Sequence, residues 1–564
     1  MHFQKESKQI IAWNILIDAL KQAMRCINFM STNISKEKRE RLVQKINAIK
    51  TYISSAAQDE NTAQLLAYIA DIEKDIKGKK YGLVFEEHRE GIDEVLENNL
   101  PVLTEDTDLF IGNGGQMNFL IEGDNLASLK LLEKTHKGRI DLIYIDPPYN
   151  TGRKDFVYDD VFVDNNDSFR HSKWLSFMGK RLQTAKKLLS DNGVIFISID
   201  DNELSQLKLL CDEFLGYENF IASIVWETKK EAKGIPPVKM CVVNHEYILV
   251  YSKTNQFRFL GDKRNVDDGF KNPDNDPRGP WKRQYLQRFG QGFAVRTIVN
   301  PSNGMSFSFE TPYTEEKMNK WIAEGVIIFP KTSDKYPARK EYFFEYSNPF
   351  KPIITSLGLY STKVNSEKLK KLFDQKKVFD YSKPTQLIAD IICKAASNNI
   401  TILDFFAGSG TTGHAVMKLN AEDGGSRKFI LCTNNENNIC RDVTYERIKR
   451  VIAKEDYKAS LKYFKVDYLP ISDKLYYEYA DELLLHIREL VELENGINFN
   501  GNAEIAIVLT EKELDDFTQN IPETCKAIYV GHDVLPTEEQ EKIFAKRKIK
   551  VNVIPEYYYR DLEG

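Results

Sequence analysis

The sequence has few cysteines, and none of them form a close pair. No two are separated by only two residues, the spacing that zinc sites and redox pairs commonly use. This argues against a zinc site and against a disulfide framework, so we expect reduced, buried thiols and a cytoplasmic protein. The seven cysteines are Cys26, Cys211, Cys241, Cys393, Cys432, Cys440 and Cys525.

Long apolar runs are also missing. No stretch approaches the ~18 apolar residues that mark a membrane-spanning helix, and the N-terminus has no apolar segment typical of a signal peptide. We therefore expect neither membrane insertion nor secretion. An excess of positive charge is absent as well, because the formal net charge of the 564 residues is -5. Any contact with nucleic acid must then use a local basic surface.

The chain is long enough for several domains, and its pattern changes along its length. Near the N-terminus, Ile10, Trp13 and Leu16 recur at helical spacing. Later, strand-like runs alternate with helical stretches, and between about 254 and 370 this regularity is lost. We expect a helical N-terminal domain at 1–85, the first half of an α/β core at 86–253, an inserted domain at 254–370, the second half of the core at 371–468 and an α+β C-terminal domain at 469–564.

Four short apolar runs predict the strands of the core. They lie at 141–146, 194–199, 244–251 and 428–432. Strands that alternate with helices favour a mostly parallel sheet covered by helices on both faces. In the C-terminal domain the pattern predicts one helix over 475–493 and a strand at 505–509.

The tetrapeptide Asp146-Pro147-Pro148-Tyr149 follows the first of these runs. In open α/β sheets, ligands bind at the carboxyl ends of the strands. The Asp146 carboxylate and the Pro147 carbonyl are placed to hold both hydrogens of a nucleobase amine, which is otherwise a poor nucleophile. The prolines fix the turn, and Tyr149 offers a flat face for an extruded base. The alternative for the tetrapeptide alone is a Pro-Pro turn with a solvated aspartate.

A glycine-rich turn lies much later, at Gly408, Gly410 and Gly413, after the strand-like run 401–404. Glycines let the backbone approach a ligand, and a helix N-terminus there suits a carboxylate such as that of a methionyl group. A phosphate loop would continue with Lys and then Ser or Thr, but His414 and Ala415 follow, which disfavours ATP. The glycines match dinucleotide spacing, but no motif for hydride transfer accompanies them.

Together these segments resemble the amino-methyltransferases of DNA. The tetrapeptide at Asp146 matches their catalytic motif, and residues 404–410 match their cofactor loop, with Phe405 where proline is usual. The catalytic motif precedes the cofactor motif, which is the permuted order of the β group. The resemblance implies a Rossmann-like, S-adenosylmethionine-dependent methyltransferase sheet and adenine N6 as the target. Cytosine N4 remains an alternative, although that chemistry more often pairs with serine at the first motif position.

The resemblance also implies a set of cofactor contacts. Asp124 matches the site that contacts the cofactor adenine, and Lys383 with Pro384 matches the segment that closes the methionine end. Glu436 takes the position of the ribose acid, although here it does not directly follow its strand. The full set is Asp124, Asp146, Lys383, Pro384, Asp404, Phe405, Phe406, Ala407, Gly408, Ser409, Gly410, Thr411, Thr412 and Glu436.

Several stretches resemble the modification subunits of type III restriction-modification systems more closely. They are 146–152, 174–178, 188–193, 272–281 and 420–425. This resemblance implies a homodimer, a separate helicase-nuclease subunit, a target-recognition domain at 254–370 and a dimerisation or partner-binding domain at 469–564. Two alternatives stay open: a solitary DNA methyltransferase, and a catalytically idle DNA-recognition scaffold. The intact Asp146 and Gly408 argue against the second.

A local basic stretch provides the expected surface for double-stranded DNA. Between 226 and 300 there are fourteen Lys or Arg against eight Asp or Glu, with aromatic residues among them. Phosphate neutralisation and base reading explain this pattern, and an ordinary solvated surface is the alternative. The expected DNA contacts are Lys229, Lys230, Lys233, Arg278, Trp281, Lys282 and Arg283.

The remaining polar candidates are assigned no chemistry. His171, His245 and His414 lack the spacing of a metal cluster, and we expect no metal. We interpret the pair His245-Glu246, on a predicted strand, as structural.

Overall fold

The computed structural model describes residues 36–55, 62–77, 85–152, 156–158, 161–164, 166–229, 240–263, 268–289, 292–346, 350–471 and 476–559. The helical spacing at Ile10, Trp13 and Leu16 lies outside these residues. The chain divides into two compact units. One comprises Met1–Arg258 with Thr355–Gly564, and the other comprises Phe259–Ile354.

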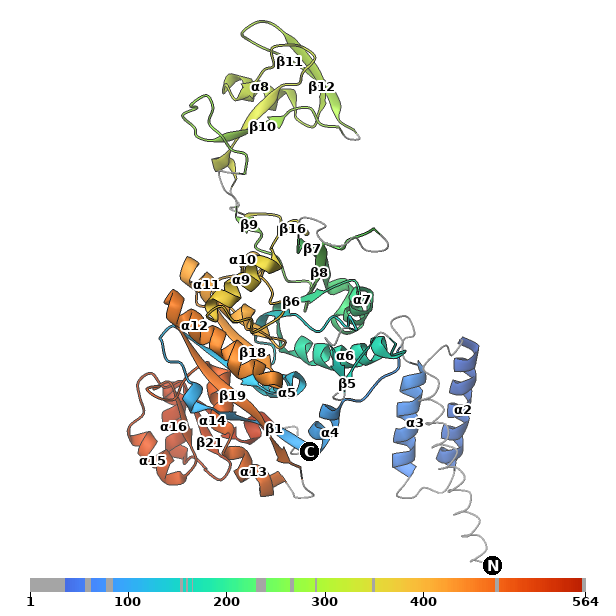
Figure 1. Ribbon diagram of the computed structural model, residues 1–564, viewed down its shortest axis with the longest axis vertical. Helices are drawn as coiled ribbons and strands as arrows, with labels where there is room; N and C mark the ends of the chain where they lie inside the picture. The colour runs from blue at the N-terminus through green and yellow to red at the C-terminus, as the bar shows by residue number, and fades with distance from the viewer. Residues whose placement is uncertain are drawn as a thin grey trace, which may run out of the picture. The chain divides into compact units, whose positions relative to one another are not determined.

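A ten-stranded sheet forms the centre of the first unit (Figure 1). Its strands, in spatial order, are β1 (Asn99–Glu105), β19 (Ala459–Pro470), β2 (Gln116–Glu122), β18 (Lys428–Thr433), β17 (Thr401–Asp404), β3 (Ile140–Ile145), β6 (Leu189–Ile199), β8 (His245–Ser252), β7 (Phe220–Glu227) and β16 (Ser356–Leu359).

The centre of this sheet is parallel, as the sequence predicts. Strands β19, β2, β18, β17, β3 and β6 run in one direction, whereas β1 and β8 are antiparallel to their neighbours. The four predicted runs are confirmed as β3, β6, β8 and β18. Strand β3 is buried on both faces, with Leu142 and Ile143 fully inaccessible. Each such side chain contributes ~1.5–3 kcal/mol of burial free energy, which is why uninterrupted apolar runs form the central strands.

Helices cover both faces, in two groups that pack among themselves. One group contains α4 (Gly91–Asn98), α5 (Asn125–His136), α6 (Arg170–Leu188) and α7 (Leu204–Cys211). The other contains α9 (Thr362–Leu372), α10 (Thr385–Ala395), α11 (Thr411–Asp423) and α12 (Glu446–Glu455). Right-handed crossovers between parallel strands place successive helices on a shared face, and a reversal of strand order moves them to the other.

The second unit, Phe259–Ile354, has a hydrophobic core of its own around Phe307, Phe309 and Met318. The predicted insert ran from 254 to 370; strand β16 and helix α9, within that range, belong to the first unit. The elements of the second unit are β9 (Asp262–Lys263), β10 (Trp281–Tyr285), β11 (Ala294–Val299), β12 (Ser306–Thr311), α8 (Glu315–Ala323), β13 (Ile327–Ile328), β14 (Ala338–Tyr342) and β15 (Phe350–Lys351).

The C-terminal segment is an α+β subdomain within the first unit. Its three strands are parallel, and β20 corresponds to the predicted strand. The single helix predicted over 475–493 is wrong, because the chain turns at Leu485 and His486, where the His486 Nδ1 lies 2.9 Å from the Leu103 carbonyl. The elements are α13 (Tyr476–Leu484), α14 (Ile487–Asn495), β20 (Ile505–Val508), α15 (Glu511–Gln519), β21 (Ala527–Gly531), α16 (Glu538–Arg547), β22 (Lys550–Ile554) and α17 (Glu556–Tyr559).

Two helices near the N-terminus, α2 (Lys36–Ser55) and α3 (Thr62–Lys77), pack on each other through Ile46, Ile53, Leu65 and Ile69. In the part of the chain that the structure describes, no helix is long and apolar enough to cross a membrane.

Candidate active site

The candidate site lies where the winding of the sheet reverses. Strands β17 and β3 are parallel neighbours, with Ile402 beside Leu142 and Leu403 beside Ile143. From β17 the chain passes through α11 to β18, whereas from β3 it passes through α6 to β6, on the other side. The two connections diverge at the carboxyl edge, and a divergence of this kind marks the usual ligand position in such sheets. Asp146 and the glycine-rich turn meet there.

Helix α6 contacts the turn after β3 through Trp174. The Trp174 indole donates a hydrogen bond of 2.7 Å from Nε1 to the Pro148 carbonyl, and the Trp174 side chain is fully buried. Asn150 completes the turn with φ +54°, a left-handed conformation that asparagine tolerates better than most residues. Trp174 and Asn150 thus fix the end of the turn that follows β3.

A lysine and a glutamate connect the catalytic turn to two other elements. Lys383 Nζ lies 2.9 Å from Asp146 Oδ1 and 3.3 Å from Glu246 Oε2. The Tyr149 hydroxyl donates to the same Glu246 oxygen over 3.1 Å, and the Lys383 ammonium lies 4.7 Å from the centre of the Tyr149 ring. This network fixes both Asp146 and the plane of Tyr149.

The network also governs how these groups ionise. Burial disfavours the charged form of Lys383, but the neighbouring Asp146 and Glu246 carboxylates outweigh burial and raise the pKa of Lys383. Burial, with the same two carboxylates, raises the pKa of the Tyr149 hydroxyl well above its usual range. Lys383 therefore stays an ammonium and Tyr149 a neutral phenol at physiological pH.

The glycine-rich turn lies beside the catalytic turn and is organised by Asp404. One Asp404 oxygen accepts the Phe406 N–H over 3.0 Å, and the other accepts the Thr412 hydroxyl over 2.5 Å. Gly408 and Gly410 have φ of +49° and +73°, and a Cβ at Gly410 would lie 3.2 Å from the Thr444 methyl group. Burial raises the pKa of Asp404 to about 7. The result is a backbone cradle that opens onto the N-terminus of α11.

A buried arginine supports this loop from α12. Arg447 Nη1 lies 2.7 Å from the Thr411 hydroxyl, 3.0 Å from the Ser409 hydroxyl and 3.2 Å from the Ser382 hydroxyl. Its Nη2 donates to the Thr385 hydroxyl over 3.1 Å. Burial lowers the pKa of Arg447 to about 9. Arg447 thus joins the glycine loop to the segment that carries Lys383.

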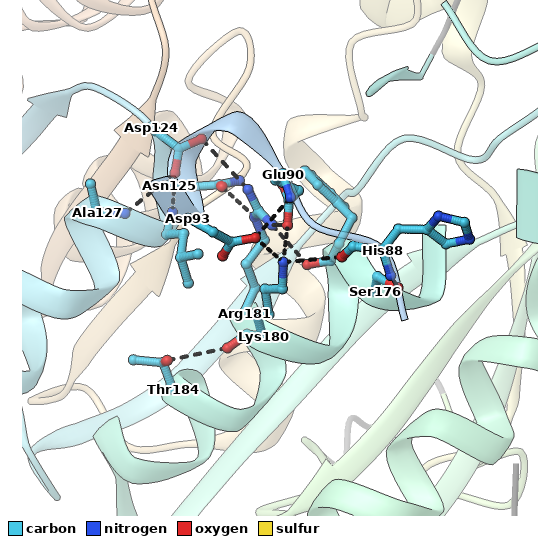
Figure 2. Close-up of polar contacts among 12 residues, drawn as sticks. His88, Glu90, Asp93, Asp124, Asn125, Ala127, Ser176, Lys180, Arg181 and Thr184 are labelled. Carbon is cyan, nitrogen blue, oxygen red and sulfur yellow. Dashed lines mark hydrogen bonds and ion pairs between the residues drawn. The ribbon is translucent and has the colours of Figure 1, made fainter. Parts of the chain in front are cut away.

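Asp124 lies at the start of α5, where it caps the helix. Its Oδ1 accepts the Leu126 and Ala127 N–H groups over 2.7 and 3.3 Å. Figure 2 shows Arg181 of α6 between Asp124, Asn125 and Glu90, with its Nη2 3.5 Å from Asp124 and its Nη1 3.0 Å from Glu90.

Asn125 connects this network to the cofactor loop at residues 404–410. Its Nδ2 donates to the Phe405 carbonyl over 3.2 Å, and its Oδ1 accepts from the Arg181 guanidinium. Arg181 itself is 1% exposed and stacks on Phe177, with 3.7 Å between the guanidinium carbon and the ring centre. These contacts therefore fix the start of α5 relative to the loop after β17.

Glu436 lies in the short turn that follows β18, and its side chain is exposed. Strand β18 is the neighbour of β17, so Glu436 belongs to the same edge of the sheet.

The expected DNA contacts fall in three different settings. Lys230 and Lys233 lie outside the described residues, directly after the exposed Lys229. In the second unit, Trp281 is 8% exposed and donates from Nε1 to Asp274 over 2.8 Å. The ring therefore belongs to the core of that unit.

The three cations of the second unit also differ. Arg278 forms two hydrogen bonds of 2.9 Å, from Nε and Nη2, to the buried Asp276, and the Arg278 interaction is the main cause that holds the pKa of Asp276 far below its usual range. Lys282 is partly buried, 3.4 Å from Glu341. Arg283 is exposed on β10. Arg278 and Lys282 thus each have an acidic partner within the second unit.

Sequence reasoning missed Glu246, Arg447 and Arg181. Glu246 was interpreted as structural, yet β8 runs antiparallel to β6, so its first residues lie at the catalytic edge. A charged residue at the beginning of an otherwise apolar strand was the available signal. Arg447 and Arg181 lie on helices whose sequence gave no signal of either contact.

Comparison with known proteins decides the family. A family model described as DNA methylase matches residues 140–446, more than half of the chain. The chain belongs to the DNA methylase family. Its match includes both the catalytic turn at Asp146 and the cofactor loop at Gly408.

Three relatives resemble this methylase. It is 37% identical to the type III restriction-modification enzyme StyLTI Mod subunit of Salmonella typhimurium, over 61% of this chain and 58% of that protein. It is 31% identical to the EcoP15I Mod subunit of Escherichia coli, over 56% and 58%. It is 35% identical to the type II methyltransferase M.KpnI of Klebsiella pneumoniae, over 56% and 79%. The matched region thus spans less than two thirds of either Mod subunit.

The residues of the methylase fit S-adenosylmethionine. A side chain at Gly408 or Gly410 would be strained by the positive φ and would press on Phe379 or Thr444. The α11 N-terminus and the Lys383 ammonium suit a carboxylate.

Proposed function

We propose that this methylase transfers a methyl group from S-adenosylmethionine to N6 of an adenine extruded from duplex DNA. The observation that carries the proposal is the meeting of Asp146 and the Gly408 loop at one reversal point of the sheet. The segment of Ser382 and Lys383 contacts both, because Lys383 pairs with Asp146 and the Ser382 hydroxyl lies 2.8 Å from the Ser409 hydroxyl. The family match over both segments and the names of the relatives support it.

The catalytic turn positions the amine. Lys383 engages Oδ1 of Asp146, so Oδ2 and the Pro147 carbonyl accept the two amine hydrogens. This arrangement favours a pyramidal nitrogen with its lone pair directed at the cofactor. S-adenosylmethionine, when bound, supplies an electrophilic methyl group. Asp146 is then placed to take the proton that the methylated nitrogen loses, and catalysis rests on positioning.

Tyr149 receives the extruded base. Extrusion costs a few kcal/mol, and stacking on an aromatic ring offsets part of this. The hydrogen bond from the Tyr149 hydroxyl to Glu246 and the nearby Lys383 hold the ring in place before the base arrives. A preorganised face loses less conformational entropy when the base binds.

Contacts with the cofactor come from four loops at this edge. The backbone of residues 405–410 and the hydroxyls of Thr411 and Thr412 surround the methionine end, which the segment at Lys383 and Pro384 closes. Asp124 would contact the adenine of the cofactor and Glu436 its ribose.

DNA binding uses Lys229, Lys230 and Lys233 in the first unit and Arg283 in the second. Their charges neutralise phosphates, and the second unit reads the recognition sequence.

The same chain acts as the modification and recognition subunit of a type III restriction-modification system. It forms a homodimer and pairs with a separate helicase-nuclease subunit. Two relatives are named as Mod subunits of such systems, and this supports the assignment. The relative named as a type II methyltransferase defines the alternative, a methylase that acts without that partner.

Methylation mapping tests the activity. The purified chain is incubated with S-adenosylmethionine and a mixed-sequence duplex, and each modified base is then identified by sequencing. We expect N6-methyladenine at one short sequence. Asp146→Ala should abolish methylation and leave cofactor binding, measured by calorimetry, nearly unchanged, because Asp146 acts on the amine. Asp456→Ala, at an exposed carboxylate, is the control and should be fully active.

Each outcome separates the alternatives. Normal methylation by Asp146→Ala would refute the catalytic role, and N4-methylcytosine would correct the target. Adding a helicase-nuclease chain encoded beside this one should produce ATP-dependent cleavage of unmethylated DNA. Failure of that chain to bind would leave a solitary methylase.

A further inference from the structure

Behind the catalytic turn lies a carboxyl group that the proposed chemistry does not use. Glu203 precedes α7, and its side chain is completely buried. It contacts Asn150, which directly follows Tyr149 and is also completely buried.

The hydrogen bonds around this pair assign most of the protons. Arg170 Nε donates to His171 Nε2 over 3.1 Å, so that ring nitrogen is an acceptor and the proton of a neutral His171 resides on Nδ1. His171 Nδ1 then donates to Glu203 Oε1 over 2.6 Å. Asn150 Nδ2 donates to the same Oε1 over 2.5 Å, which fills both lone pairs of that oxygen.

Two acceptors of the same pair then remain. Among the described residues, neither Asn150 Oδ1 nor Glu203 Oε2 has a hydrogen-bond partner, and both atoms are buried. Buried acceptors without a donor are rare in folded proteins. One proton on Glu203 Oε2, donated to Asn150 Oδ1, would satisfy both atoms at once.

We propose that Glu203 is a neutral carboxylic acid that donates its proton to Asn150, and that this acid-amide pair is a positioning device for the catalytic turn. Its effect on turnover rests on the proposed function. Asn150 is adjacent to Tyr149, so the pair holds the end of the turn opposite Asp146.

The charges around Glu203 agree with the neutral form. Burial raises the pKa of Glu203 to about 8; the Asn150 hydrogen bond and Arg170 on α6 act to lower it, and Asp200 in the preceding turn acts to raise it. Burial and the neighbouring Arg170 lower the pKa of His171, so His171 adds no positive charge. The acid is therefore protonated below about pH 8. Above that pH an ionised Glu203 would oppose the Asn150 carbonyl with a second acceptor, and the turn would lose one of its supports.

The pH profile of turnover tests the pair through Glu203→Gln. The glutamine amide accepts at Oε1 and donates from Nε2, as the protonated acid does, but it does not titrate. We expect the kcat of the unmodified protein to decline above about pH 8. We expect Glu203→Gln to lack this decline and to have a kcat at pH 7 within about twofold of the unmodified protein. Glu203→Ala should lower kcat about tenfold or more, with a smaller change in the KM for cofactor. An unchanged alkaline decline in Glu203→Gln would overturn the proposal.

Infrared difference spectroscopy tests the acid without any turnover. The spectrum of the full-length protein minus that of Glu203→Gln should contain a carboxylic acid C=O band at pH 7 that vanishes well above pH 8. A carboxylate signal at pH 7 would overturn the pair. A chain that shows the acid band but methylates nothing would retain the pair and refute only the proposed function.

Discussion

Glu246 links the turn at Asp146 to the segment that carries Lys383. It accepts the Tyr149 hydroxyl and lies within ion-pair distance of Lys383, whose other partner is Asp146. Asp146 therefore shares its counterion with Glu246.

Substitution of Tyr149 separates the ring from its hydroxyl. Tyr149→Phe keeps the stacking face and loses the bond to Glu246, and we expect kcat/KM to fall roughly three- to tenfold, because a hydrogen bond is worth ~0.5–1.5 kcal/mol. Tyr149→Ala also loses stacking, worth ~1–3 kcal/mol per base, and should fall at least tenfold further. Steady-state methylation of a duplex measures both. Equal activity of Tyr149→Ala and the unmodified protein would remove the stacking role.

At the residue scale, the sequence predicts the parts of the site whose residues are contiguous in the chain. It does not predict contacts between residues that are far apart in the chain. Asp146–Tyr149 and Gly408–Gly410 are readable because neighbouring residues act together. Glu246 and Arg447 act on residues more than thirty positions away, so their roles depend on sheet order and helix position. Glu203 gave no signal, since its function comes from burial beside Asn150.

At the scale of the secondary-structure elements, helix α12 supports the cofactor loop through the Arg447 side chain. A guanidinium that contacts the Ser382, Ser409 and Thr411 hydroxyls fixes two loops with one planar group. An ammonium at this position reaches fewer of these oxygens.

We therefore expect Arg447→Lys to weaken binding of S-adenosylmethionine by about tenfold or more, since losing a hydrogen bond to a buried charged group costs ~1.5–3 kcal/mol and 1.4 kcal/mol is tenfold in Kd. Calorimetric titration gives the Kd. Arg450→Lys, on the same helix at a position that is 30% exposed and paired with Asp374 and Glu446, is the matched control and should bind normally. An equal loss in both variants would show a general effect on α12.

The elements themselves were predicted with unequal success. Buried parallel strands such as β3 are continuous apolar runs, so sequence identifies them. The α13–α14 boundary was missed because a turn at His486 depends on a carbonyl of β1, more than three hundred residues earlier.

At the scale of the whole molecule, the basic residues of the stretch 226–300 are divided between the two compact units. The basic stretch read from the sequence divides into cations that stabilise the second unit and cations that face solvent. Arg278 is of the first kind and Arg283 of the second.

Salt dependence of DNA binding should distinguish these two arginines. Arg283→Ala should weaken binding and reduce the slope of log K against log salt by about 1, with no change in melting temperature, because it removes one phosphate contact. Arg278→Ala should instead lower the melting temperature, because it leaves the buried Asp276 without its main partner. The assignment is wrong if Arg278→Ala changes the salt slope and leaves the melting temperature alone.

The reversal of winding between β3 and β17 has a consequence for synthesis of the chain. Asp146 emerges from the ribosome more than two hundred residues before its neighbour Asp404. Until β17 arrives, one side of the apolar strand β3 has no partner and is an open edge of the kind that associates with other chains. A chain interrupted within Phe259–Ile354 carries the turn at Asp146 but lacks the loop at Gly408, so we expect it to be inactive in methyl transfer and prone to association through the open edge of β3.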